Sequence, residues 1–81
     1  MNGDEGIRKS IERLVDEEHD LWEKEAAGLG SEQDRRRLEE LEVQLDQLWD
    51  LLRQRRALTQ AGRDPDGARL RDPVTVERYE Q

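Results

Sequence analysis

Five leucines near the middle of the chain lie three or four residues apart, which is the spacing of one helix face. They are Leu38, Leu41, Leu45, Leu48 and Leu52. A stripe of this kind carries no reactive groups, so it predicts how the chain packs and not what chemistry it performs. No catalytic or cofactor-binding motif of comparable strength accompanies it. We therefore expect a non-enzymatic protein with no catalytic residue, bound metal or cofactor.

The composition favours a small helical protein with a charged surface. Eighty-one residues make one small domain, and 32 % of them are hydrophobic against 43 % charged. The chain has no cysteine, so a disulfide framework and a thiolate metal site are both excluded. Its net charge of −7 opposes nucleic acid and anionic membranes. Because no apolar run has the length of a leader or a membrane span, we expect a cytoplasmic protein.

The N-terminal part predicts a first helix over residues 5–27. Its apolar residues form one stripe, and Asp4 and Glu5 suit the positive end of a starting helix. The break follows at Gly28-Leu29-Gly30. The stripe consists of Ile7, Ile11, Leu14, Val15, Leu21 and Trp22.

A second helix is predicted over residues 32–61. Ser31 is a good N-cap, and Gly62 is suited to the position just after the last turn. The link between the helices is too short for anything but an antiparallel hairpin. Residues 1–62 are therefore interpreted as one helical hairpin.

Residues 63–81 are expected to form a turn followed by a tail. Pro65 and Gly67 lie in the turn signal, and Asp72 resembles an N-cap before Pro73. A short helix is predicted over 73–80, with Val76 and Tyr79 on one face. Eight residues cannot hold a helix alone, so this tail either packs on the hairpin or is ordered by a partner.

Two helices cannot bury all the predicted apolar residues, because each side chain has only one neighbouring helix. Pairing two hairpins into a four-helix bundle is the simplest remedy, and it would also cover the tryptophans that flank the two stripes. We therefore expect an all-α homodimer. The predicted core and interface residues are Leu14, Leu21, Trp22, Leu38, Leu41, Leu45, Leu48, Trp49 and Leu52.

Charges along the two helices favour the same hairpin. Antiparallel pairing brings Arg35-Arg36-Arg37 beside the acidic stretch from Glu18 to Glu25. It also brings the arginines at 53, 55 and 56 beside Asp4 and Glu5. Exposed ion pairs of this kind select the register of the two helices more than they stabilise the fold. An alternative is that Arg53, Arg55 and Arg56 contact a phosphate or an acidic partner.

Glu18 interrupts the apolar stripe of the first helix. Helical bundles bind iron or manganese through inward-facing carboxylates and histidines, and His19 directly follows, with Glu25 one heptad further. A metal site that includes Glu18 and His19 is therefore the alternative function. The competing interpretation is that Glu18 pairs with an arginine or lies at the wet edge of the bundle.

The segment from Leu38 to Leu58 resembles the first helix of the all-helical chorismate mutases. The matching residues are Leu45-Asp46, Leu51-Leu52 and Arg55 or Arg56. However, the substrate-binding arginine of that pattern falls on Glu42, and too few residues follow to build two more helices. We interpret the resemblance as shared helix packing.

A second resemblance covers nearly the whole chain. It rests on Leu14-Val15-x-Glu17-Glu18-His19-x-Leu21, on the stretch from Leu41 to Ala57, on Ala61-Gly62-x-Asp64-Pro65, and on Val76-Glu77-x-Tyr79-x-Gln81. In these motifs the chain is similar to a family of short acidic actinobacterial proteins with no assigned function. The resemblance implies a small helical protein and supplies no activity. The function that we expect is therefore an interaction module, a homodimer that binds another protein.

Overall fold

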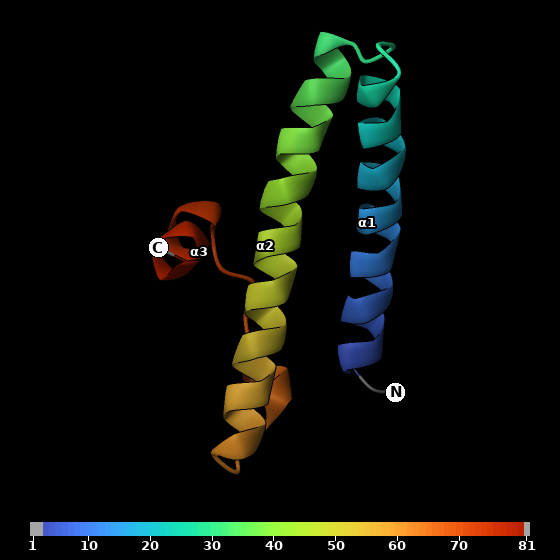
Figure 1. The fold of residues 1–81 in the computed structure, drawn as a ribbon. Helices are drawn as coiled ribbons and strands as arrows, with labels where there is room; N and C mark the ends of the chain where they lie inside the picture. The colour runs from blue at the N-terminus through green and yellow to red at the C-terminus, as the bar shows by residue number, and fades with distance from the viewer. Residues whose placement is uncertain (1–2, 81) are drawn as a thin grey trace.

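The computed structural model describes residues 3–80, with side chains up to Val76. Its elements are α1 (Gly3–Ala26), α2 (Glu32–Gln60), the short 3-10 helix η1 (Pro65–Gly67) and α3 (Pro73–Glu80). Figure 1 shows α1 and α2 side by side and antiparallel, with α3 on the opposite side of α2 from α1. The predicted all-α hairpin with a short C-terminal helix is confirmed. Among the described residues, none of the helices combines the length and the apolar character of a membrane span.

The loop between α1 and α2 is held by caps on both sides. Gly28 has a left-handed φ of 75°, which lets its N–H and that of Leu29 donate back to the last carbonyls of α1. On the other side, the Ser31 hydroxyl accepts from the Asp34 N–H and the Asp34 carboxylate accepts from the Ser31 N–H, each at 3.1 Å. These caps turn the chain back on itself within a few residues.

The end of α2 repeats this geometry. Gly62 has a φ of 73°, and the N–H of Arg63 donates to the Leu58 carbonyl at 2.8 Å. The chain then reverses through η1, where the Asp64 carboxylate accepts from the N–H of Asp66 at 2.9 Å. The tail is thereby directed back along α2.

The hydrophobic core lies between α1 and α2, with a second centre under the tail. Among the described residues, Ile11, Leu41, Leu45 and Val76 are the buried hydrophobic side chains. The other leucines of the predicted core are half-buried, namely Leu14, Leu21, Leu38, Leu48 and Leu52.

Val76 is completely covered, so the tail packs on the hairpin, which was one of the two predicted alternatives. The side chain of Tyr79, expected on the same face, lies outside the described side chains.

Ion pairs join the two helices near both ends of the hairpin. Arg35 donates to Glu25 at 2.7 Å near the loop, and Arg55 pairs with Asp4 at the open end. Arg37 forms a two-pronged pair with Glu17, and this hydrogen bonding lowers the pKa of the Glu17 carboxyl. The expectation for Arg36 was wrong, because Arg36 pairs with Glu32 on its own helix. Its position, one residue before Arg37, turns it away from α1.

Candidate functional site

Both tryptophans lie on one side of the hairpin, and both are largely exposed. Trp22 of α1 is 57 % exposed and Trp49 of α2 is 43 % exposed. Val15, near the middle of α1, is 41 % exposed. Arg8, Val15 and Trp22 are seven residues apart, so they lie in one row along α1. We call this side, which carries Arg8, Val15, Trp22 and Trp49, the tryptophan face.

A basic hollow occupies the end of the tryptophan face that is far from the loop. It has a volume of about 460 Å³. Three arginines and one aspartate line it, so its charge is positive. The lining residues are Asp4, Arg8, Trp49, Leu52, Arg53, Arg56, Thr59 and Gln60.

An acidic hollow occupies the loop end of the same face. It is smaller, about 270 Å³, and it surrounds the other tryptophan. Four glutamates and one arginine line it, so its charge is negative. The lining residues are Glu18, Trp22, Glu25, Arg35, Leu38, Glu39 and Glu42.

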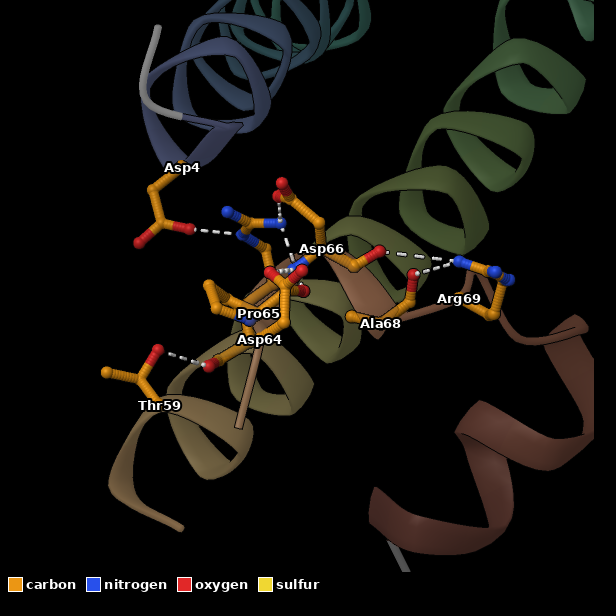
Figure 2. Close-up of polar contacts among 8 residues, drawn as sticks. Asp4, Thr59, Asp64, Pro65, Asp66, Ala68 and Arg69 are labelled. Carbon is orange, nitrogen blue, oxygen red and sulfur yellow. Dashed lines mark hydrogen bonds and ion pairs between the residues drawn. The ribbon is translucent and has the colours of Figure 1, made fainter. Parts of the chain in front are cut away.

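Arg55 differs from its two neighbours in the predicted basic cluster. Its side chain is only 11 % exposed and pairs with both Asp4 and Asp66, while its Nη1 also donates to the Pro65 carbonyl. Figure 2 shows the carboxylates of Asp4 and Asp66 converging on one guanidinium group. These hydrogen bonds raise the pKa of Arg55. Arg55 therefore ties α1 and η1 to α2, whereas Arg53 and Arg56 line the basic hollow.

The structure places Glu18 and His19 on different sides of α1. Glu18 lines the acidic hollow beside Trp22. His19 is exposed, and its Nε2 lies 3.0 Å from a carboxylate oxygen of Glu23. Within the described residues, no three metal-ligating side chains are grouped to hold an ion.

A buried carboxylate was missed by the sequence analysis. Asp50 is 4 % exposed, accepts from Gln54 Nε2 at 2.9 Å and lies 3.5 Å from Arg71 Nε. The Gln54 amide also bonds both the N–H and the carbonyl of Arg69, at 3.2 and 2.7 Å.

Gln47 adds a further bond, donating to the Arg71 carbonyl at 3.0 Å. We call Gln47, Asp50 and Gln54 the tail clasp. Their spacing of three and four residues is the signal that was available in the sequence. Polar residues at that spacing are also typical of a solvated helix face, so the spacing alone does not identify a clasp.

Comparisons with known proteins give relatives of the chain but no activity. A family model described as "Protein of unknown function (DUF2630)" matches residues 3–81. Uncharacterized proteins of Mycobacterium bovis and of Mycobacterium tuberculosis strain H37Rv are each 48 % identical over 52 residues, which is 64 % of this chain. The matched region spans 60 % of the length of these relatives. No solved structure matches the chain significantly.

Proposed function

Because this chain belongs to the DUF2630 family of proteins of unknown function, its role must be inferred from its own surface, and we propose that it is a small helical interaction module. In this proposal, two copies pair through the tryptophan face to form a four-helix bundle. The observation that carries it is the exposure of Trp22 and Trp49 on one side of the hairpin.

The shape of the molecule supports pairing through this face. Its backbone extends over 50 × 28 × 15 Å, and α1 and α2 lie side by side as one pair (Figure 1). The hairpin is therefore a single layer of helices. A second layer would remove Trp22, Val15 and Trp49 from water, at a gain of roughly 25 cal/mol for each Å² of apolar surface.

The proposed role is binding and not catalysis. Asp50 is the buried charged side chain among the described residues, and it bonds Gln54 and Arg71 and so holds the tail. Arg55 likewise holds α1 and η1. These contacts give both of these shielded side chains a structural role.

Binding of a further protein is also part of the proposal. Leu70 and Val74 have large exposed fractions. Leu70 lies over the groove that Ser10 and Leu14 line on the other face of the hairpin, and α3 packs against the side of α2 away from α1 (Figure 1). A dimer formed through the tryptophan face would leave these side chains accessible. We therefore propose the tail as the contact for another protein.

The test is sedimentation of the wild type and of Trp22→Ser across micromolar to millimolar concentrations. Trp22 is largely exposed within one chain, so this change should leave the hairpin folded and helical by circular dichroism. We expect a wild-type dimer, and at least a tenfold weaker association for Trp22→Ser, because a buried aromatic anchor is lost.

Leu29→Ser is the matched control. Leu29 is 73 % exposed, but it lies in the loop outside the tryptophan face, so this variant should associate like the wild type. A wild type that stays monomeric, or equal losses in both variants, would overturn the proposed pairing.

A further inference from the structure

The tryptophan face has opposite charges at its two ends. The basic hollow, with Arg8, Arg53 and Arg56, surrounds Trp49 at the open end of the hairpin. The acidic hollow, with Glu18, Glu39 and Glu42 among its carboxylates, surrounds Trp22 at the loop end. Each end therefore combines a tryptophan with a local charge that is complementary to the other end.

The hairpin's own ion pairs locate the centre of this face. Asp4 pairs with Arg55 at one end, and Glu25 pairs with Arg35 at the other. Midway between these pairs lie Val15 on α1 and Leu45 on α2. Arg8 and Trp22 lie seven residues on either side of Val15, and Leu38 and Leu52 lie seven on either side of Leu45.

We infer that the second copy docks antiparallel, related by a two-fold axis that passes near Val15 and Leu45 and runs across the helices. This inference rests on the proposed function and specifies its geometry. Such a rotation places the basic hollow of each protomer over the acidic hollow of its partner. A two-fold interface makes both of these contacts at once, because the same patch is used by both chains.

The antiparallel arrangement also matches individual side chains. Rotation about Val15 exchanges Arg8 and Trp22, so the guanidinium of one protomer meets the indole of its partner, a favourable cation–π pairing. The same rotation exchanges Leu38 with Leu52 and leaves Val15 against its own copy. A parallel dimer would instead bring basic hollow to basic hollow and acidic hollow to acidic hollow, which like-charge repulsion disfavours.

Spin-label distances test the orientation directly. The chain contains no cysteine, so Leu29→Cys labels only the loop end and Arg63→Cys only the open end. We expect a distance of about 45 Å between the two labels of the Leu29→Cys dimer, from a rise of 1.5 Å per residue. A mixture of the two variants should add an intermolecular distance within about 20 Å, two interhelical spacings.

The possible failures are distinguishable. A dimer with a short distance between its two Leu29→Cys labels would overturn the antiparallel geometry and leave the proposed pairing standing. A chain that sediments as a monomer at all concentrations would overturn both.

A charge reversal gives an independent test, because it should weaken association of the antiparallel dimer and strengthen association of a parallel dimer. Arg8→Glu would place a carboxylate beside the partner's acidic hollow in the antiparallel dimer, so we expect at least a tenfold weaker association. In a parallel dimer the same change would face arginines and strengthen association. Lys9→Glu is the matched control, since it makes the same charge change at an exposed neighbour that pairs with Glu5 on α1. An Arg8→Glu variant that associates as tightly as Lys9→Glu would overturn the inference.

Discussion

At the scale of single residues, carboxylates at helix ends and between the helices are tied to specific donors. Lys24 and the Ser31 N–H lower the pKa of Asp34, the Thr75 N–H and hydroxyl lower that of Asp72, and Arg37 lowers that of Glu17. A carboxyl whose pKa is lower in the folded state stabilises the fold at pH values above its unfolded pKa. That stabilisation is lost as the pH falls through the folded pKa.

These shifts predict how the melting temperature depends on pH. The ordinary pKa values are 4.5 for the glutamate and 3.8 for the aspartates. The melting temperature should therefore be constant from about pH 7 to about pH 5, and it should decrease once the pH is lowered past about 4. In the wild type, Lys24 Nζ lies 2.8 Å from a carboxylate oxygen of Asp34. The variant Asp34→Asn keeps an acceptor for the helix cap but loses this ion pair. It should therefore melt below the wild type at pH 7, and the difference between the two melting temperatures should narrow as the pH falls below about 4.

Circular-dichroism melts between about pH 3 and pH 7 measure this difference. Glu12→Gln removes an exposed carboxylate of α1 and is the matched control, expected to follow the wild type at each pH. A gap between Asp34→Asn and the wild type that stays constant down to pH 3 would contradict the assignment to Lys24 and Ser31.

At the scale of elements, the tail depends on α2 and not on its own helical propensity. An eight-residue helix such as α3 is unstable in isolation, and here it is anchored by the completely covered Val76. Upstream of α3, the tail clasp bonds the backbone of Arg69 and Arg71. The Gln54 amide satisfies both backbone groups of Arg69, as a neighbouring β-strand would.

Loss of this clasp should loosen the tail while leaving the hairpin ordered. Gln54→Ala removes the acceptor of the Arg69 N–H and a donor to Asp50, so amide exchange at Arg69 and Val76 should accelerate roughly tenfold, as expected for a loss of about 1.4 kcal/mol. Amides in the middle of α1 should be unaffected. Hydrogen exchange followed by NMR measures both regions.

Gln33→Ala is the control for the removal of a glutamine side chain from α2. Gln33 is exposed in the first turn of that helix, so exchange in the tail should match the wild type. Equal acceleration in the tail and in α1 of Gln54→Ala would indicate global unfolding and would contradict the local role of the clasp.

At the scale of the whole molecule, the hydrophobic core is small. Four hydrophobic side chains are buried in the described part of the chain, and the leucine stripe is otherwise half-buried. A chain with so little buried apolar surface is marginally stable alone. Pairing through the tryptophan face would add a second apolar layer to this core.

Melting should therefore depend on protein concentration. Between about 5 µM and about 500 µM, mass action favours the dimer by about 2.7 kcal/mol, so the melting temperature should rise by several degrees. Circular dichroism in cells of different path length measures this shift. Trp22→Ser should show a smaller rise, and a wild-type melting temperature independent of concentration would argue against a folded dimer.

The hairpin was predictable because its signals are local in the sequence. The break at Gly28, the Ser31 cap and the glycine at 62 each satisfy the backbone of their own turn, so the turns follow from neighbouring residues. The leucine stripe likewise determines which side of α2 meets α1. Opposite charges at the two ends then select the antiparallel register, with Arg55 on Asp4 and Arg35 on Glu25.

The position of the tail and the composition of the tryptophan face depend on contacts between distant segments. Asp50 and Gln54 become a buried clasp only when Arg69 and Arg71 return to α2, fifteen or more residues later. In the sequence they are indistinguishable from solvated polar residues. Likewise, periodicity groups Trp22 with the apolar stripe, but one neighbouring helix covers only the centre of a stripe. The sequence thus determines the hairpin through local backbone and charge preferences, whereas the tertiary packing decides which side chains stay exposed.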